Sequence, residues 1–256
     1  DINRALRSVP GVNIYEEDGF GLRPNISLRG TSPERSSKIT MMEDGVLIAP
    51  APYSASSAYY FPTIARMEAV EVLKGSSQIQ FGPFTTGGAI NMISNQIPES
   101  FSGRIRSSYG SFNSSQFHAI IGDNMNNYGY SLEYLNYGSD GFKKLSNDQN
   151  TGFNKNDIVL KFKVNLFPKL VVKHALDIKL QYSDEESNET YLGLTDDDFN
   201  TNPFNRYDGS AVDLMKNIHK QIVLTHTVDF TKNFRITTNA YHNYFRRNWS
   251  KADYIT

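Results

Sequence analysis

The sequence predicts two structural parts, an N-terminal α+β domain of short strands and tight turns over residues 1–98 and a series of antiparallel strands over residues 99–256. Two observations lead to this prediction. Before Pro98, brief apolar runs stop at glycine or at Gly-Pro and Gly-Gly pairs, which adopt backbone angles that other residues resist. After Pro98, segments of roughly ten residues alternate apolar and polar side chains, which is the period of a strand with one apolar face.

The bulk composition excludes several classes of protein. Lys and Arg number 26 against 27 Asp and Glu, so the charge balance indicates no basic surface for nucleic acid. The chain has no cysteine, which excludes disulfides, thiolate metal sites and cysteine nucleophiles and leaves the redox compartment open. No run approaches the eighteen or so apolar residues of a membrane helix, and the first residues show no signal sequence. A membrane barrel stays compatible, because its alternating strands average out as hydrophilic.

The first forty residues predict a helix and two strands. An amphipathic helix is expected over residues 1–12, with Asp1 as its cap and Pro10-Gly11 ending it. The polar, glycine-punctuated stretch 13–23 is expected to be a loop. Strands follow at 26–28 and 38–42, and an exposed tip joins them.

The rest of the N-terminal domain alternates turns with short elements. After the Asp44-Gly45 turn, the proline-rich stretch 50–54 is too rich in proline for the inside of a sheet and predicts another tip. A short helix is expected over 62–67, and strands over 69–74 and 89–94.

Alternation is clearest in residues 156–166 and 170–182. In the first stretch Ile158, Leu160 and Phe162 fall on one face, and Asp157 and Lys161 fall on the other. One face of the predicted strand is therefore apolar and the other is polar.

Seven segments of this kind follow Pro98, at 102–109, 114–123, 128–139, 155–167, 170–182, 219–230 and 234–249. Short turns at 124–127, 167–169 and 231–233 alternate with long connections at 140–154 and 183–218. Tyrosine and phenylalanine gather near the segment ends, as in the aromatic girdles of membrane barrels. Short periplasmic turns and long extracellular loops are typical of transmembrane barrels, although a soluble antiparallel sandwich would also alternate.

Six pieces of the first part occur in a specific order and spacing. They are Ala5-Leu6-Arg7-Ser8-Val9-Pro10-Gly11-Val12, Ile26-Ser27-Leu28-Arg29-Gly30, Met42-Glu43-Asp44-Gly45-Val46 and Glu68-Ala69-Val70-Glu71-Val72-Leu73-Lys74-Gly75, followed by Phe81-Gly82-Pro83 and Gly87-Gly88-Ala89-Ile90-Asn91. Together they resemble the plug domain of TonB-dependent outer-membrane receptors, which import iron chelates and other scarce nutrients.

The resemblance implies a plug domain over 1–98, followed over 99–256 by the first strands, about seven, of a 22-stranded barrel in the outer membrane of a Gram-negative bacterium. Seven strands cannot close a barrel, so the native polypeptide is expected to continue beyond Thr256 by roughly four hundred residues. Receptors of this family also begin earlier, with a strand and the TonB box, so the sequence is interpreted as a fragment. The implied partners are an iron chelate, the TonB complex of the inner membrane and outer-membrane lipids.

Ligand contacts are expected at the plug tips, because the tips face the extracellular vestibule in the family. By the Arg-Gly and Asp-Gly landmarks the tips fall near 17–23, 32–37 and 50–54. The candidate contacts are Arg23, Arg35 and Tyr53, with Ser32, Ser36 and Ser54 as hydrogen-bonding neighbours. The planar fork of arginine suits a carboxylate-rich chelate. The alternative is that each is an ordinary solvated loop side chain.

Arg29 and Lys74 occupy the positions at which basic plug residues of the family pair with barrel glutamates and lock plug to wall. Lysine stands where arginine is more usual, so a point charge replaces a fork there. Alternatively, Arg29 or Lys74 could pair with Glu68 or Glu71 inside the plug.

The longest connection narrows the resemblance to a subgroup. The stretches 189–199 and 202–207, together with Ala49-Pro50-Ala51-Pro52-Tyr53, are similar to the ferric-citrate receptor subgroup. This similarity implies ferric dicitrate or a similar carboxylate chelate as the cargo.

Metal-binding and catalytic signatures are weak. Asp196-Asp197-Asp198 lacks the spaced ligands of a calcium loop and is expected to be a solvated acidic turn. The five histidines show no metal-binding spacing, and no nucleophile elbow or phosphate-cradling loop is present, so we expect neither a resident cofactor nor an enzyme. The remaining alternatives are a receptor for haem, another siderophore or an oligosaccharide, and a passive pore or adhesin.

Overall fold

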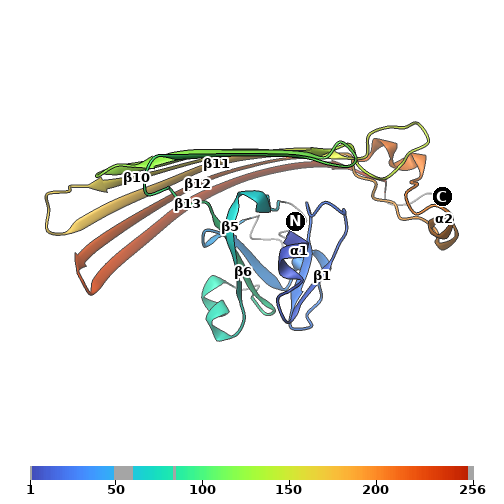
Figure 1. Cartoon of the computed structure of the whole chain (residues 1–256). Helices are drawn as coiled ribbons and strands as arrows, with labels where there is room; N and C mark the ends of the chain where they lie inside the picture. The colour runs from blue at the N-terminus through green and yellow to red at the C-terminus, as the bar shows by residue number, and fades with distance from the viewer. Residues whose placement is uncertain (1, 49–59, 83–84, 253–256) are drawn as a thin grey trace. The chain divides into compact units, whose positions relative to one another are not determined.

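The computed structural model describes residues 2–48, 60–82 and 85–252. The chain divides into two compact units between Gln96 and Ile97, two residues before the predicted boundary. The ribbon is shown in Figure 1.

The first unit begins with a helix shorter than expected. Helix α1 covers Ile2–Leu6, whereas the sequence predicted a helix over residues 1–12. The residue before a proline is pushed out of the helical region, so Val9 cannot continue a helix towards Pro10. The amide of Val9 instead donates to the Leu6 carbonyl oxygen at 2.9 Å, which closes the last turn.

Strand β1, Val12–Tyr15, covers the first residues of the stretch 13–23, so the prediction of a loop was wrong at 13–15, whereas 16–23 form no helix or strand. It pairs antiparallel with β2, Asn25–Leu28, with Ile14 opposite Ile26. Four residues beside a polar loop carry too little alternation to identify β1 from sequence alone, and its pairing with β2 decides the conformation.

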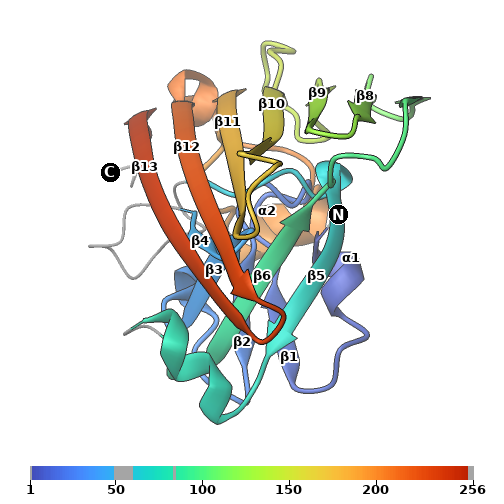
Figure 2. The same ribbon diagram turned by 90° about the vertical axis from the view of Figure 1, so that its left-hand side faces the viewer.

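A four-stranded sheet with the order β4-β3-β6-β5 forms the centre of the first unit. Its strands are β3 (Ile39–Glu43), β4 (Val46–Leu47), β5 (Met67–Leu73) and β6 (Gly88–Ser94). Strand β6 runs parallel to β3 and antiparallel to β5, and Figure 2 shows β5 and β6 side by side. Short 3₁₀ turns precede three of these strands: η1 (Glu34–Ser36) before β3, η3 (Ile64–Arg66) before β5 and η4 (Ser76–Phe81) before β6.

Strand β6 begins at a position that only glycine can occupy. Gly88 has φ +144°, and a Cβ there would overlap Leu28 Cδ1 and lie 2.8 Å from the carbonyl oxygen of Leu73. This close approach lets Ile90 and Met92 reach the core, where both are fully buried.

The second unit is one antiparallel sheet of seven strands in sequence order, β7 to β13. The strands are β7 (Ser102–Tyr109), β8 (Ser115–Asn124), β9 (Tyr128–Ser139), β10 (Phe153–Leu166), β11 (Lys173–Ser187), β12 (Leu214–Thr231) and β13 (Phe234–Ser250). The seven predicted segments all form strands, and Figure 1 shows the longest of them running side by side in one layer.

Two strands extend further than predicted at the ends that carry the long connections. Strand β11 continues to Ser187 and β12 starts at Leu214. A short helix, α2 (Asp196–Thr201), and a 3₁₀ turn, η5 (Asp208–Val212), lie in the connection between them.

The sheet has its apolar side chains on an exposed face. Ile158, Leu160 and Phe162 of β10 are 43%, 39% and 37% exposed. We call the face that carries them the apolar face. Its other members include Phe117, Ile121, Leu132, Leu180, Ile222 and Leu224, all of which are exposed. A water-soluble sandwich would bury this face against a second sheet.

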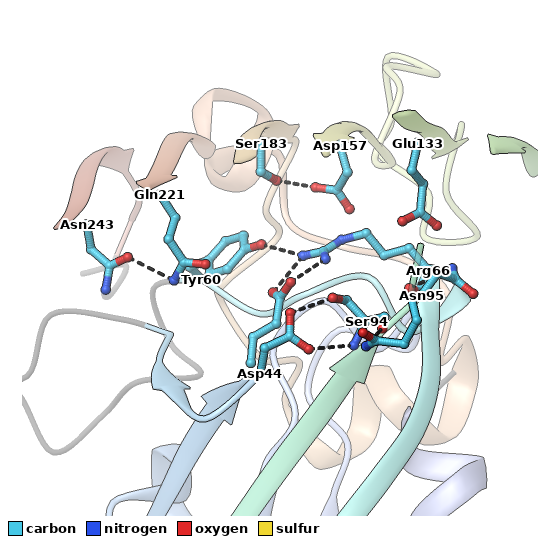
Figure 3. Close-up of polar contacts among 12 residues, drawn as sticks. Asp44, Tyr60, Arg66, Ser94, Asn95, Glu133, Asp157, Ser183, Gln221 and Asn243 are labelled. Carbon is cyan, nitrogen blue, oxygen red and sulfur yellow. Dashed lines mark hydrogen bonds and ion pairs between the residues drawn. The ribbon is translucent and has the colours of Figure 1, made fainter. Parts of the chain in front are cut away.

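The opposite face, here called the polar face, carries hydrogen-bonded and ionic side chains. His118 Nε2 lies 2.6 Å from Glu133 Oε1, and Lys155 Nζ lies 3.5 Å from Glu185 Oε2. The Ser183 hydroxyl donates to Asp157, and Gln221 donates to Asn243 at 2.9 Å (Figure 3). An apolar exposed face with a polar opposite face is the arrangement of a transmembrane barrel wall.

None of the helices in the described part of the chain is long and apolar enough to span a membrane.

Candidate functional site

The first predicted tip is organised by the carboxylate of Asp18. Its Oδ1 accepts hydrogen bonds from the amides of Phe20 at 2.6 Å and Leu22 at 3.2 Å, and its Oδ2 accepts from the amide of Arg23 at 2.8 Å. These bonds fix the backbone of Arg23, whose side chain is only 7% exposed. Arg23 remains a predicted ligand contact. Because Arg23 is buried, it is not an ordinary solvated loop side chain.

Asn25 joins the first tip to the second. Its Nδ2 donates to Glu17 Oε2 at 3.0 Å, and its Oδ1 accepts from the amide of Arg35 at 2.8 Å. Arg35 and Ser36 both have positive φ, 51° and 54°. The side chain of Asn25 therefore holds a backbone conformation that these two residues would otherwise avoid.

Ser36 and Ser32 occupy different environments in the second tip. Ser36 is fully buried, and its hydroxyl accepts from the amide of Ile26 at 2.8 Å and donates to the carbonyl of Pro24 at 3.0 Å. Ser32 is exposed, and its hydroxyl accepts from the amide of Glu34 at 3.3 Å. Ser36 thus fixes the tip to β2, and Ser32 is open to a ligand.

Arg35 carries an exposed cation. Its guanidinium makes no hydrogen bond or ion pair with the residues that the structure describes. The charge is therefore available to an anion. Tyr53 and Ser54, the remaining predicted contacts, lie outside the described residues.

The two predicted lock residues have partners inside the first unit. Arg29 donates to the carbonyl of Gly87 at 3.3 Å and to Gln78 Oε1 at 3.1 Å. Lys74 donates to the carbonyl of Pro10. The contacts of both residues are with neutral oxygens, in place of the alternative pairing with Glu68 or Glu71. Pairing with barrel glutamates stays a prediction.

The first unit contains a buried ionic cluster that the sequence did not predict. The guanidinium of Arg66 donates to both carboxylate oxygens of Glu43, at 2.6 and 2.8 Å, and both side chains are 1% exposed or less. The hydroxyl oxygen of Tyr60 accepts a third bond from Arg66 at 2.9 Å (Figure 3). The cluster ties the end of β3 to η3.

Asp44, in the turn after β3, extends the polar contacts to β6. Its carboxylate accepts from the amide of Ser94 at 2.9 Å and from the Ser94 hydroxyl at 2.5 Å (Figure 3). The predicted Asp44-Gly45 turn is thus bonded to β6, the last strand of the unit.

In the second unit, the two long connections are joined to each other. The hydroxyl of Ser146 donates to Asp208 at 2.7 Å, and the amide of Lys144 donates to the carbonyl of Phe204 at 2.8 Å. The amide of Arg206 returns a bond to the carbonyl of Lys144 at 2.8 Å. Residues 140–154 and 188–213 therefore form one hydrogen-bonded loop assembly.

Asp198 forms the main side-chain contact inside this assembly. Its Oδ2 accepts from the Tyr207 hydroxyl at 2.5 Å and from the Thr195 hydroxyl at 2.8 Å. These two hydrogen bonds lower the pKa of Asp198 below its ordinary value of 3.8. The acidic run was expected to be a turn; it forms the first turn of α2 instead, capped by Thr195, because carboxylates are favourable at a helix N-terminus.

Arg206 lies beside this contact with an incomplete set of partners. Its guanidinium donates to the carbonyls of Pro203 at 2.9 Å and Asn205 at 2.5 Å, and pairs with no carboxylate among the described residues. Partial burial lowers the pKa of Arg206. An anion bound here would restore the solvation that the guanidinium has lost.

The described residues contain no group of three or more His, Cys, Asp or Glu side chains that could hold a metal ion. His174 Nδ1 and His226 Nε2 lie 3.2 Å apart on neighbouring strands, and two rings alone are too few for the usual metal geometries.

The chain matches known proteins in two ways. The family model described as TonB-dependent Receptor Plug Domain matches residues 1–89. Among solved structures, the ferric citrate transporter FecA aligns over 98% of this chain and 38% of its own, with a TM-score of 0.80 and 22% identity.

Two further structures agree with this fold. The ferric yersiniabactin uptake receptor FyuA from Yersinia pestis aligns over 97% of this chain and 39% of its own, with a TM-score of 0.78 and 17% identity. The siderophore receptor PiuA from Acinetobacter baumannii aligns over 97% and 34%, with a TM-score of 0.68 and 20% identity. The chain spans less than two fifths of each of these proteins.

Proposed function

We propose, on the premise that this chain carries a TonB-dependent receptor plug domain followed by strands of a barrel fragment, that it is part of an outer-membrane receptor that imports an iron chelate. The observation that carries the proposal is that one chain contains both a matched plug domain and a seven-stranded sheet with an exposed apolar face. A passive pore or an adhesin could share the wall, but neither requires a plug domain.

The proposed receptor takes its cargo from the extracellular side and releases it to the periplasm. The outer membrane has no nucleotide supply or usable ion gradient, so the work has to come from the inner membrane. In our proposal the TonB complex supplies it by acting on the plug domain. Uptake of iron chelate by cells that produce the full protein should then stop when the TonB complex is removed. Uptake that continued at the same rate would indicate a passive pore.

We further propose that the cargo is a carboxylate-rich chelate such as ferric citrate. Two arginines support this: Arg35, exposed and unpaired among the described residues, and Arg206, bonded only to backbone carbonyls there. Guanidinium groups bind carboxylates with two parallel charge-assisted bonds. Similarity to the ferric citrate transporter FecA over 98% of this chain is in line with this cargo.

A binding experiment tests the cargo. Each charge-assisted hydrogen bond contributes about 1.5–3 kcal/mol, so Arg35→Ala and Arg206→Ala should each weaken ferric citrate binding roughly ten- to a hundredfold. The measurement is titration calorimetry on the full receptor in detergent. Arg4→Ala is the matched control, because Arg4 is an exposed arginine of the first unit without a partner among the described residues. Unchanged affinity in both test variants would exclude the proposed contacts.

Another iron chelate is the second candidate. The ferric yersiniabactin receptor FyuA aligns over nearly the same span with a TM-score of 0.78, so the fold alone does not separate the two cargos. A panel of chelates in the same calorimetric assay distinguishes them, since the cargo is the chelate whose affinity the arginine variants reduce.

A further inference from the structure

The apolar face of the sheet ends in a polar belt near the long connections. On β10 the outward residues change from Leu160 and Ile158 to Asn156 and Asn154. The strand register places Asn156 opposite Asn136 and Asp184. Side chains connect this row, because Asn136 donates to Asn156 Oδ1 at 2.9 Å and Asn156 donates to Asp184 Oδ1 at 3.1 Å.

Beyond this row lies a cleft of about 390 Å³ that is lined mainly by residues with amide, hydroxyl and carboxylate groups, together with Phe153 and Gly138. Its volume falls in the range of about 300–1,000 Å³ that small-ligand sites occupy. The residues that carry the argument are Asn113, Ser115, Asp140, Asn154, Glu186 and Asn188. Ser115, Asn154 and Glu186 lie an even number of positions from Phe117, Ile158 and Leu180 on their strands, so they share the apolar face and the cleft opens on that side.

Several polar atoms of the cleft have no partner among the described residues. Asn154 accepts a bond from Asn136 through Oδ1, and its Nδ2 donor is unused. Asn188 donates to Asn150 at 3.2 Å, and its Oδ1 acceptor is unused. Ser115 offers a free hydroxyl, and Glu186 keeps one carboxylate oxygen free while the other pairs with Lys216 at 2.8 Å. The cleft therefore offers unused hydrogen-bond donors and acceptors close to one another.

This chemistry selects hydroxyl groups over anions. A hydroxyl donates and accepts at once, so it matches a surface of mixed donors and acceptors. The cleft lining contains two carboxylates, Asp140 and Glu186, and no lysine or arginine, so it offers no cation to a phosphate. The hydroxyl groups of a saccharide match its mixed donors and acceptors.

We infer that this cleft binds the saccharide headgroup of a glycolipid in the outer leaflet. The argument for a lipid-borne saccharide is continuity, because the cleft opens on the same face as the apolar side chains and directly beyond them. The inference rests on the proposed outer-membrane location but is independent of the cargo, since it uses none of Arg23, Arg35 or Arg206.

The test uses the full receptor in lipid nanodiscs with a rough lipopolysaccharide as the probe, and native mass spectrometry counts the glycolipid that stays bound. One hydrogen bond contributes about 0.5–1.5 kcal/mol, which is roughly a two- to tenfold change in affinity. Asn154→Ala and Asn188→Ala should each reduce retention by that factor, and the double variant by roughly the product. Asn248→Ala is the matched control. Asn248 lies on the apolar face of β13, opposite Lys216 of β12 in the strand register, and it does not line the cleft.

Two further arms separate the possible sources of the ligand. A dephosphorylated glycolipid should bind as well as the native one, and inorganic phosphate should not compete. If dephosphorylation abolishes binding, or if the cleft variants behave as Asn248→Ala does, the inference is wrong. If a lipid-free oligosaccharide binds and the glycolipid does not, the cleft serves a soluble saccharide and the headgroup assignment fails. Uptake of iron chelate, measured in parallel, reports on the proposed function separately.

Discussion

Glu43 and Arg66 show how much a single buried pair contributes to the first unit. Removing one partner of a buried ion pair costs about 3–5 kcal/mol, because the other charge stays buried without compensation. Glu43→Gln should therefore lower the hydrogen-exchange protection of Ile39–Glu43 roughly a hundredfold or more.

The Arg7 and Glu16 pair supplies the control for this prediction, since its side chains are 66% and 37% exposed. Exposed ion pairs contribute about 0–1 kcal/mol, so Glu16→Gln should change the hydrogen-exchange protection of Ile39–Glu43 less than tenfold. Equal effects of Glu43→Gln and Glu16→Gln would mean that the buried cluster does not stabilise β3.

Asp198 makes the loop assembly sensitive to acid. The pKa of Asp198 is lowered below 3.8 in the folded loop by its hydrogen bonds from Tyr207 and Thr195. The charged carboxylate thus stabilises the folded loop above that value, and the contribution is lost as the pH falls through the lowered pKa. The protection of residues 195–207, corrected for the intrinsic exchange rate at each pH, should stay constant down to about pH 4 and fall below it.

Two variants isolate this carboxylate. Asp198→Asn should remove the acid-induced change, because an amide does not titrate in this range. Asp197→Asn should retain it, since Asp197 accepts a bond through its backbone carbonyl and its carboxylate has no hydrogen-bond partner among the described residues. A pH profile that is identical in both variants would rule out Asp198 as the titrating group.

At the scale of elements, the two faces of β10 predict opposite responses to charge. An arginine in the middle of a lipid-facing barrel strand costs about 2–4 kcal/mol. Leu160→Arg should therefore reduce assembly of the full protein into membranes, measured by heat-modifiable gel mobility. Thr237→Arg on the polar face of β13, also at an exposed position, should assemble normally. Normal assembly of Leu160→Arg would show that the apolar face does not contact lipid.

Alternation predicted the strands best where both faces have distinct chemistry. Strand β9 has the predicted bounds, Tyr128–Ser139, because tyrosine and leucine alternate with small or polar residues along most of its length. Strand β11 continues to Ser187, beyond its predicted end at residue 182. The prediction stopped early because the residues from Asp184 to Ser187 are polar on both faces and show no alternation. Their conformation is decided by pairing with β10 and β12, which a local pattern does not contain.

Whether a residue of the candidate site could be predicted depends on how far apart in the sequence its contacts lie. The tips around Arg23 and Arg35 follow from short motifs in the sequence. The Glu43 and Arg66 pair joins residues 23 positions apart, and no local signal connects them. Arg206 belongs to the stretch 202–207 noted in the sequence, but its lack of a carboxylate partner among the described residues is a property of the folded loop assembly.

At the scale of the whole molecule, the two units of the chain differ in whether their apolar side chains are buried or exposed. The first unit buries its apolar residues, including Ile26, Leu28 and Ile90, as a water-soluble domain does. The second exposes Leu132, Leu160 and Leu180 and pairs polar side chains on its other face. The boundary between Gln96 and Ile97 therefore marks a change of environment as well as of secondary structure.

The most direct test of this account is a site-directed spin-label scan of residues 157–162 in the full protein reconstituted into liposomes. Labels at Ile158, Leu160 and Phe162 should be accessible to oxygen dissolved in the bilayer and protected from a water-soluble nickel chelate. Labels at Asp157, Val159 and Lys161 should show low oxygen accessibility, which gives a period of two along β10. Equal access of the nickel chelate to both sets, without the period of two, would contradict the assignment of this sheet to a membrane barrel.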